Sequence, residues 1–362
     1  MNIPLLIFQT DNFFSKLNEM HLLEKIILYF SQKEILKMRL ISKLFNELFK
    51  KTWCKYNYCK MYSKSVNNVL RLFSFLNHID LSHCININHL GIRHLKDIRC
   101  IILYNCQQIT DIDLYYLKGV NNISLYNCNK ITDKGLFYLK GVRYINLCFC
   151  TQITDIGLSY LTGVHTINLS YCTQITDKGL SYLKGVNTIF LSYCKQITDS
   201  GISYLSGVRT IRLNGCTQIT DKGLYYLKGV HTISLSFCDK ITDMGVSYFK
   251  GVNWINLTYC KQITDVGLSY LTGVHTIYIN GCYNITDKGL SYLTGVHTID
   301  ITNCNKITDK GLYYLKGVHI IYIEGCDKIT YKGLLHLKNI QKITYPNVKI
   351  KFFYLLYKKF HP

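Results

Sequence analysis

The sequence predicts an α/β solenoid, in which short parallel strands and short helices stack unit upon unit. Two observations carry this prediction. Twelve of the sixteen cysteines recur every 22 residues, from Cys84 to Cys326. The residues around each cysteine follow the pattern I-x-L-x-x-C-x-x-I-T-D-x-G-L-x-Y-L-x-G-V-x-x, and twelve copies fill residues 79–342. Such a period is typical of solenoids and leaves no room in that span for a catalytic domain of ordinary size.

Each unit reads as strand, turn, short helix and turn. In one copy, Ile167 and Leu169 alternate with polar residues, which is the period of a half-buried strand. Thr176 or Asp177 then offers a side-chain oxygen as a helix N-cap. Leu180 lies three residues before a second leucine, so both face the same side of the helix.

A glycine is predicted to end each helical turn in the left-handed conformation, as at Gly185. Two copies lack this glycine, and Asp97 and Asn339 are expected to take its place, because both tolerate that conformation better than most residues. The next strand follows directly. The convex side of the solenoid should therefore be thin, with one helical or 3₁₀ turn in each unit.

Stacking is required because a single unit exposes both flanks of its apolar wedge. The period of 22 lies within the range of leucine-rich repeats. The L-x-x-C and I-T-D-x-G-L segments closely resemble the cysteine-containing subclass of leucine-rich repeats, which implies a horseshoe with the strands on its concave face. Units of that subclass are usually longer between helix and strand than those of this chain.

The composition fits a folded protein with a large core. Of 362 residues, 48% are apolar and 18% charged, and only three are proline. This excludes a highly charged or proline-rich disordered chain. No apolar run reaches the length of a membrane-spanning helix, and the N-terminus lacks the basic region of a signal peptide, so a protein that is neither secreted nor membrane-bound is expected.

The net charge of +20 is spread along the chain: +7 in residues 1–78, +9 in 79–342 and +4 in the last 20 residues. The charge of the repeats is dilute, which favours solubility over a dedicated phosphate groove. The abundance of Ile, Asn, Lys and Tyr indicates an AT-rich genome, and this lowers the weight of the lysines as evidence for nucleic-acid binding.

The segment before the repeats is predicted to form short amphipathic helices. Residues 22–30 place apolar side chains on one face, and Ser31 with Glu34 forms a capping box for the next helix. In that helix Leu36, Leu40 and two further leucines are spaced by four. About 40 residues of short helices make a poor core alone, so a partner surface is expected.

Residues 17–53 resemble an F-box, from the opening Leu17 to the closing Trp53, with Asn18 where the family has proline. The resemblance implies docking on a Skp1-like adaptor that links the chain to a cullin ubiquitin ligase. The residues expected to bind Skp1 are Leu17, Leu22, Leu23, Ile26, Ile27, Leu36, Leu40, Ile41 and Phe45. The predicted units are an F-box-like domain (1–54), a helical connector and N-terminal cap (55–78), the repeats (79–342) and a C-terminal cap (343–362).

An F-box followed by leucine-rich repeats is the order found in a class of ubiquitin-ligase substrate receptors. Near-identical repeats, AT-rich codons and a degenerate F-box together resemble the F-box/repeat proteins of giant viruses of amoebae. The resemblance therefore implies a viral protein that acts in the host cytoplasm, with an unidentified protein as its substrate.

The cysteine ladder predicts buried thiols, with no disulfides and no metal. Stacked cysteines point the same way, which disfavours bridges and tetrahedral coordination. Each thiol is expected to meet a neighbouring backbone carbonyl, in a reducing cytoplasm. Cys148 is expected to face outward, because it lies two residues before Cys150 on a strand.

Three further rows recur at fixed registers. The histidines His165, His231, His275, His297 and His319 share their register with Asn and Arg, which indicates a polar surface position rather than a metal or pH-sensing column. A tyrosine before the second helical leucine, as at Tyr182, indicates packing between helices. Lysines such as Lys184 indicate a solvated helix face.

Outward strand positions are the candidate binding site, because the repeats differ most where the concave face is expected. Aromatic side chains among small polar ones suit a recognition surface, although neutral drift of exposed positions is the alternative. Trp254 is placed just before a strand. The candidate substrate-binding residues are Phe149, Tyr171, Phe190, Tyr193, Arg212, Phe237, Trp254, Tyr259, Tyr278 and Tyr322.

The function expected from these patterns is a substrate-recognition subunit of a Skp1–cullin–F-box ubiquitin ligase. No phosphate loop, zinc-ligand spacing or nucleophile elbow occurs, so no catalytic residue, cofactor or metal is expected. One alternative is an interaction scaffold or decoy, in which Asn18 marks a decayed docking surface. A nucleic-acid binder driven by the basic ends is a third, less favoured alternative.

The last 20 residues are predicted to cap the open end of the solenoid. The final repeat departs from the pattern, with Tyr331 in place of Asp and Asn339 in place of Gly. Beyond Pro346, six apolar residues can cover the flank while four lysines stay in water. A basic amphipathic membrane anchor is the competing interpretation.

Overall fold

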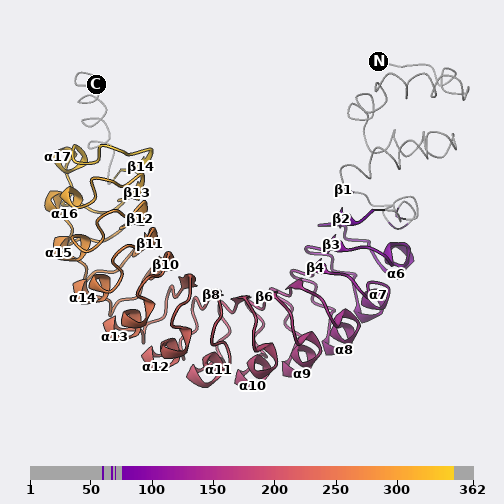
Figure 1. Cartoon of the computed structure of the whole chain (residues 1–362). Coiled ribbons are helices and arrows are strands. Elements are labelled where there is room, and N and C mark those ends of the chain that lie inside the picture. The colour runs from indigo at the N-terminus through magenta and orange to yellow at the C-terminus, as the bar shows by residue number, and fades with distance from the viewer. Residues whose placement is uncertain (1–58, 61–66, 68–69, 71–75, 346–362) are drawn as a thin grey trace, which may run out of the picture.

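The computed structural model describes residues 59–60, 67, 70 and 76–345. They form an arc with the strands on its inner side and the helices on its outer side (Figure 1). The predicted leucine-rich-repeat horseshoe is therefore confirmed. The F-box-like segment and the tail beyond residue 345 lie outside the described residues, so their predicted roles are not tested.

Within the described residues the strands form one parallel sheet of fourteen, in which each strand pairs with its neighbours in the sequence. Neighbouring repeats pair in register, with Ile167 opposite Ile189 and Ile189 opposite Ile211. The strands are β1 (Cys59–Lys60), β2 (His78–Asp80), β3 (Cys100–Ile102), β4 (Asn122–Ser124), β5 (Tyr144–Asn146), β6 (Thr166–Asn168), β7 (Thr188–Phe190), β8 (Thr210–Arg212), β9 (Thr232–Ser234), β10 (Trp254–Asn256), β11 (Thr276–Tyr278), β12 (Thr298–Asp300), β13 (Ile320–Tyr322) and β14 (Lys342–Thr344).

Both ends of this sheet extend beyond the twelve predicted repeats. Strand β1 lies in the segment predicted as a connector and pairs with β2, with Cys59 opposite Ile79. Strand β14 pairs with β13 at the boundary of the predicted tail. The sheet therefore has a partner strand on each side of the repeats.

The convex side is thin, as predicted, because each repeat contributes a helix of only four or five residues. Six of these helices continue into a three-residue 3₁₀ turn. The α-helices are α6 (His89–Ile92), α7 (Asp111–Tyr115), α8 (Asp133–Leu136), α9 (Asp155–Leu158), α10 (Asp177–Leu180), α11 (Asp199–Ser203), α12 (Asp221–Leu224), α13 (Asp243–Val246), α14 (Asp265–Ser269), α15 (Asp287–Leu290), α16 (Asp309–Tyr313) and α17 (Tyr331–Leu334). The 3₁₀ turns are η3 (Arg93–Leu95), η4 (Phe137–Leu139), η5 (Ser159–Leu161), η6 (Ser181–Leu183), η7 (Tyr225–Leu227) and η8 (Ser247–Phe249).

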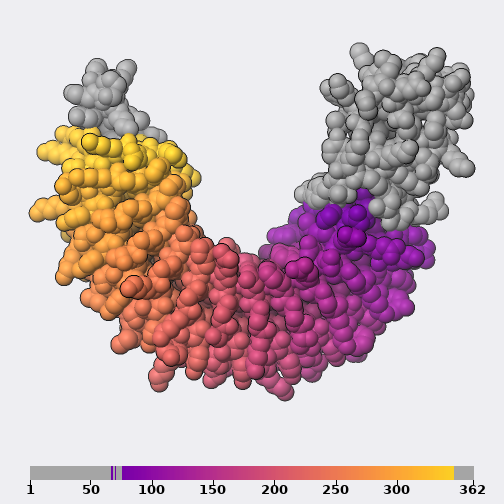
Figure 2. Space-filling model, viewed as in Figure 1, coloured from indigo at the N-terminus to yellow at the C-terminus, as the bar shows by residue number. Residues whose placement is uncertain are grey.

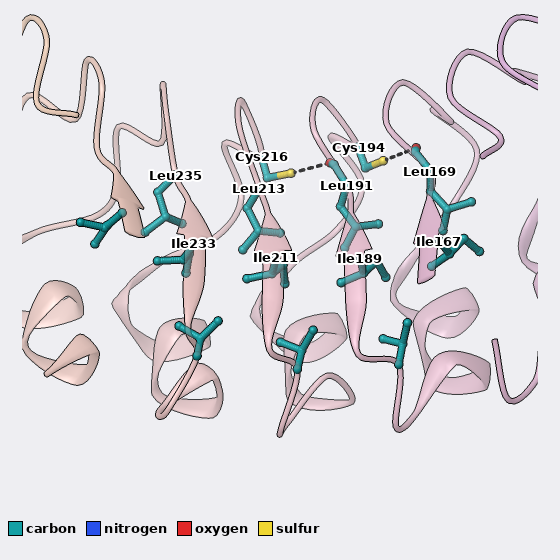
Figure 3. Close-up of a cluster of buried hydrophobic side chains, with 14 of the residues drawn as sticks. Ile167, Leu169, Ile189, Leu191, Cys194, Ile211, Leu213, Cys216, Ile233 and Leu235 are labelled. Atoms are coloured by element: carbon teal, nitrogen blue, oxygen red, sulfur yellow. Dashed lines mark hydrogen bonds between the residues drawn. The ribbon is translucent and has the colours of Figure 1, made fainter. Parts of the chain in front are cut away.

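The core is a continuous column of strand and helix side chains between the sheet and the helices. Ile189, Leu191 and Cys194 are fully buried, and the same positions are buried in neighbouring repeats (Figure 3). Each ladder cysteine from Cys106 to Cys326 donates a hydrogen bond from its thiol to the backbone carbonyl of the residue 25 positions earlier. Cys194 Sγ, for example, donates to the carbonyl of Leu169 in the preceding repeat at 3.1 Å. Burial raises the pKa of the Cys194 thiol to about 12. The predicted buried, hydrogen-bonded thiols are confirmed.

A second column joins the repeats on the helix side. Oδ1 of Asp199 accepts a hydrogen bond from Thr220 N at 2.8 Å, and Oδ2 accepts one from Thr220 Oγ1 at 2.6 Å. Thr220 caps α12 by accepting from Lys222 N. This Thr–Asp clamp recurs between successive repeats in the pairs Asp111–Thr132, Asp133–Thr154, Asp155–Thr176, Asp177–Thr198, Asp199–Thr220, Asp221–Thr242, Asp243–Thr264, Asp265–Thr286, Asp287–Thr308 and Asp309–Thr330.

Of the two residues predicted as possible helix caps, threonine is confirmed and aspartate has another role. Threonine is the cap, and aspartate reaches the next repeat because its carboxylate satisfies the backbone N–H and the hydroxyl there. The clamp also explains the glycine of the D-x-G motif. A Cβ at Gly135 would lie 2.5 Å from Oδ1 of Asp111.

One repeat replaces the clamp with a contact of its own. In the first repeat, His89 occupies the position of the clamp aspartate, so no aspartate is available there for Thr110. In the second repeat, Asp113 occupies the position of the glycine of the D-x-G motif. Oδ2 of Asp113 accepts from Thr110 N at 2.7 Å and from Thr110 Oγ1 at 2.8 Å. Asp113 is 1% exposed, and its Oδ1 has no hydrogen-bond partner within the described part of the chain. The carboxylate thus comes from the same repeat instead of the preceding one.

Asn67 makes the corresponding contact at the start of the array. Its Oδ1 accepts from Asn88 N at 3.1 Å, across the same 21-residue separation as in the clamps. Its Nδ2 donates to the Asn86 carbonyl at 2.8 Å. Asn67 therefore ties the segment before the repeats to the first repeat.

Most of the predicted left-handed glycines are present, with Gly185 at a φ of +80°. The prediction for Asp97 and Asn339 is wrong, since neither residue has a positive φ. At Asp97 the physical reason is local. Lys96, just before it, remains right-handed at φ −57° and ψ −26°, whereas Lys140 at the same register has already turned to ψ 133°.

Candidate interaction surface

The concave face consists of strand residues that point away from the helices. Ile189 and Leu191 are buried, so Phe190 between them faces the inside of the arc. The inside of the arc is open in the space-filling view (Figure 2). By the same alternation Arg212, Tyr278 and Tyr322 lie on this face, from β8, β11 and β13. The structure therefore places these candidate residues on the predicted surface.

Several of these side chains contact one another across neighbouring strands. The Arg212 guanidinium lies over the Phe190 ring at 4.7 Å from its centroid. The Trp254 and Tyr278 ring centroids are 5.5 Å apart. Trp254 is the first residue of β10 rather than a residue before the strand, which corrects its predicted position. Lys342 Nζ lies 5.3 Å from the centroid of the Tyr322 ring. Aromatic and cationic groups thus contact one another at three places along the described part of the concave face.

The aromatic residues just before the ladder cysteines have an unusual backbone. Phe149, Tyr171, Tyr193, Phe237 and Tyr259 have φ between +58° and +63°. Asparagine and glycine take the same conformation at this register, as at Asn105 and Gly215. Non-glycine residues in the left-handed region are uncommon, and such strain tends to gather at functional sites. We therefore take these five residues as the centre of the candidate surface.

Ring stacking holds these residues in a row along the edge of the concave face. The ring centroids of Phe149 and Tyr171 are 4.2 Å apart, and those of Tyr171 and Tyr193 are 4.7 Å apart. Phe237 and Tyr259 form a second stack at 5.0 Å, and Phe237 remains 44% exposed. The two stacks bring together five of the ten candidate residues.

Tyr104 and Tyr126 extend the first stack, although neither is among the residues predicted from the sequence. Their centroids are 4.1 Å apart, and Tyr126 contacts Phe149 edge to face at 5.4 Å. They precede their cysteines by two residues rather than one, so a search at one register does not find them. A search for aromatic residues at either of the two positions before each cysteine would have found them.

Each stack ends on a glycine. A Cβ at Gly215 would lie 2.7 Å from the Tyr193 ring, and a Cβ at Gly281 would lie 2.5 Å from the Tyr259 ring. Both glycines also have a positive φ. Glycine at these two positions therefore gives the backbone its turn and leaves room for the preceding ring.

Polar residues on the concave face mainly hold the backbone. Oδ1 of Asn168 accepts from Ser170 N at 3.0 Å, and Oδ1 of Asn146 accepts from Cys148 N at 3.0 Å. Cys148 is only 6% exposed, so the thiol that was expected to face outward is not accessible to solvent. Its side chain points away from the core but is covered on that side, and burial raises its pKa to about 11.

The tyrosine row on the helix side and the row of histidines are both ordered by contacts between neighbouring repeats. Tyr182 packs partly buried against the core, as do Tyr116, Tyr138, Tyr160 and Tyr248, which confirms helix packing for these five. At the same register Tyr204, Tyr226, Tyr270 and Tyr314 are exposed. The rings of His275, His297 and His319 are stacked, with centroid separations of 4.7 Å and 4.4 Å. No group of three or more His, Cys, Asp or Glu that could hold a metal ion occurs among the described residues.

These features define the class of the protein: it is a leucine-rich-repeat solenoid, a fold whose extended concave surface serves protein interaction. Residues 164–184 and 296–316 match a family model described as Leucine Rich repeat. The comparison with curated proteins gave no match.

Solved structures with a similar fold support the same assignment. Rad7 in its complex with Elc1 from yeast gives a TM-score of 0.55 at 18% identity, over 89% of this chain and 92% of that chain. An internalin (inlF) from Listeria monocytogenes gives 0.51 at 21% identity, over 71% and 83%. The Toll–Spatzle complex of Drosophila gives 0.52 at 10% identity, over 79% and 48%. At these identities the likeness shows the fold alone.

Within the described residues, no helix is both long and apolar enough to pass through a bilayer.

Proposed function

We propose that the chain is the substrate-recognition subunit of a Skp1–cullin–F-box ubiquitin ligase. The order of its parts supports this proposal, since the F-box-like residues 17–53 precede the solenoid with only a short connector between them. Asn67 and β1 join that connector to the first repeat. In this proposal the N-terminal segment binds a Skp1-like adaptor, and the solenoid holds a protein target.

The observation that carries the second half of the proposal is the strained aromatic row on the concave face. Positions that elsewhere in the chain use glycine or asparagine hold Phe149, Tyr171 and Tyr193, at a backbone conformation costly for aromatic residues. Large rings held by stacking lose little entropy on binding, which favours them as contact residues. We propose that these rings, with Phe190 and Tyr278, contact the target.

The proposed partners and location follow from the same role. The adaptor and the cullin ligase act in the cytoplasm, which is the host cytoplasm if the chain is viral. The buried thiols, each with a raised pKa, suit a reducing compartment. No catalytic step is assigned to the chain, since in this proposal the ligase supplies the chemistry.

An interaction scaffold or decoy is the alternative function. It would keep the concave surface but would not bind Skp1, because Asn18 replaces the proline of the F-box pattern. The two functions differ in a single measurable property, which is adaptor binding.

Binding to purified Skp1 tests the proposal. The full chain is compared with a chain of residues 55–362, which keeps β1 and Asn67, and with Leu36→Asp and Ile41→Asp variants of the full chain. We expect Skp1 to co-purify with the full chain but not with residues 55–362 or with the Leu36→Asp and Ile41→Asp variants. Lys33→Gln, in the same segment, is the matched control and should retain binding. A full chain that fails to bind while a known F-box protein binds would support the decoy.

Target binding is tested separately on the concave face. Proteins captured from host cells by the full chain are compared with those captured by a Phe190→Ala/Tyr278→Ala variant. Tyr204→Ala, on the convex side, is the control. Targets that bind equally to all three chains would exclude the concave face as the recognition surface.

A further inference from the structure

The excess charge of the repeats gathers on one rim of the horseshoe. Each repeat has a four-residue loop from the helix to the next strand, first at 96–99 and last at 338–341. The twelve loops hold eleven lysines and arginines and one acidic residue, Asp97, and so carry 11 − 1 = +10. Residues 79–342 as a whole carry a net charge of +9, so the remaining residues of the repeats, outside these loops, carry a net charge of −1. The charge is therefore dilute along the sequence but concentrated in these loops.

These loops form one continuous edge because the strands that follow them pair in register. We call this edge the basic rim. Its cations are Lys96, Arg99, Lys118, Lys140, Arg143, Lys184, Arg209, Lys228, Lys250, Lys316 and Lys338, and all eleven are exposed. The five histidines of the repeated register lie in the same loops.

Aromatic rings, rather than carboxylates, position several of these lysines. Lys118 Nζ lies 4.0 Å from the centroid of the Tyr115 ring and 5.2 Å from that of Tyr138. Lys228 Nζ lies 3.9 Å from Tyr225 and 5.0 Å from Tyr248. None of the rim lysines or arginines forms an ion pair within the part of the chain that the structure describes. A cation–π contact orients an ammonium group without neutralising it, so the charge stays available to a ligand.

We infer that the basic rim binds an acidic, extended polypeptide segment of a partner protein. Neighbouring repeats are about 4.8 Å apart at the sheet and further apart on the helix side of the arc, where the lysines lie. In an extended peptide, alternate side chains lie about 7 Å apart on one side of the chain. A peptide with acidic residues at alternate positions can therefore place one carboxylate at each successive repeat.

Nucleic acids fit the same rim less well. Single strands bind by stacking bases on free aromatic faces, but Lys118 and Lys228 already lie over the rings of this edge, which contact one another edge to face. A duplex is stiff over about 150 base pairs, whereas the rim follows a strongly curved arc (Figure 1). A flexible acidic chain can follow that arc.

The inference is tested with the full chain and a fluorescein-labelled peptide of alternating glutamate and serine, by fluorescence anisotropy. The rim variant is Lys118→Gln/Lys140→Gln/Lys228→Gln/Lys250→Gln. The matched control is Lys134→Gln/Lys178→Gln/Lys222→Gln/Lys288→Gln, which removes the same charge from exposed lysines on the helix N-termini. We expect the rim variant to bind about tenfold more weakly and the control to change less than about twofold, at an ionic strength of about 0.1 M.

A second variant separates charge from packing, because the lysines contact rings. Arg99→Gln/Arg143→Gln/Arg209→Gln removes three rim charges whose side chains contact no ring among the described residues. It should weaken peptide binding several-fold without lowering the melting temperature. Equal losses in the rim and control variants would overturn the inference, since only net charge would then matter. So would an unlabelled RNA strand or DNA duplex that displaces the peptide at a concentration below that of unlabelled peptide. These outcomes are independent of Skp1 binding.

Discussion

Two columns of side chains join the repeats, and they follow different rules. On the helix side, ten interfaces use the same Thr–Asp clamp, in which one carboxylate oxygen accepts from the backbone N–H of the next repeat and the other from its hydroxyl. At the edge of the concave face, the residue before each cysteine is His, Asn, Phe, Tyr or Gly. There the shared requirement is a positive φ. Uniform chemistry thus marks a bonded contact, and varied chemistry marks a surface free to specialise.

Loss of one clamp should have the largest effect on stability. Asp199→Ala leaves the Thr220 N–H and hydroxyl without their acceptor, and hydrogen bonds to charged groups contribute about 1.5–3 kcal/mol. We expect a loss of about 2–3 kcal/mol, measured by urea unfolding. Asp239→Ala is the control, because that side chain makes no clamp, and should cost less than about 0.5 kcal/mol. Equal effects would show that the clamp is not the stabilising contact.

The aromatic column should be sensitive to backbone shape rather than to side-chain chemistry. Phe237→Val places a β-branched residue at a φ of 61° and removes the stack on Tyr259, so a loss of about 2 kcal/mol is expected. Phe237→Asn keeps a residue that tolerates this conformation and should change stability by about 1 kcal/mol or less. Both are read from thermal unfolding. If asparagine proved as damaging as valine, stacking rather than φ would govern this column.

The exceptional interface allows the clamp rule to be tested by exchange. Asp113→Gly should cost about 1–2 kcal/mol, because Thr110 loses its carboxylate. His89→Asp alone should also destabilise, since two carboxylates then compete for Thr110. The double variant restores the pattern of the other repeats and should be within about 0.5 kcal/mol of the original chain. Additive losses in this double-mutant cycle would contradict the assigned roles.

The smallest expected effect concerns pH. Burial, followed by repulsion from His319 and His275, lowers the pKa of His297 below its usual value. The unfolded chain then binds more protons than the folded one, so the stability contributed by neutral His297 is complete above pH about 6.5 and is lost as pH falls through the lowered pKa. His297→Asn, which copies Asn253, should flatten the fall in melting temperature between pH about 7.5 and about 5.5. An unchanged pH profile would rule out this stack as its source.

The sequence predicted the fold well because its strongest signals are periodic. The 22-residue spacing, the strand alternation and the buried cysteines recur in all twelve repeats, so one correct interpretation applies along the whole array. Prediction was weaker where a contact crosses between repeats. The partner of Asp199 is 21 residues away, and a pattern within one repeat assigns that carboxylate to its own helix.

The candidate surface was predicted in position but not in conformation. Alternation along a strand was enough to place Phe190, Arg212 and Tyr278. It could not show that Tyr171 has a positive φ, or that Tyr104 and Tyr126 continue its stack. Alternation gave the direction of the Cys148 side chain but could not show that the thiol is covered. The basic rim was missed because charge was summed along the chain and not by register.

The two exceptional contacts at the start of the array, Asn67–Asn88 and Asp113–Thr110, affect how the chain folds. The middle repeats are so alike that one of them offers nearly the same contacts to several others, and a chain that skipped a copy would form the same bonds with a looped-out segment. Proteins built from similar units misassemble in this way. The pairing of Asn67 with Asn88, and of Asp113 with its own Thr110, occurs only at the N-terminal end of the array. Those two interfaces differ from the other ten, so the repeats that form them cannot pair with the wrong neighbour without losing these contacts. They therefore fix the register in which the following repeats stack.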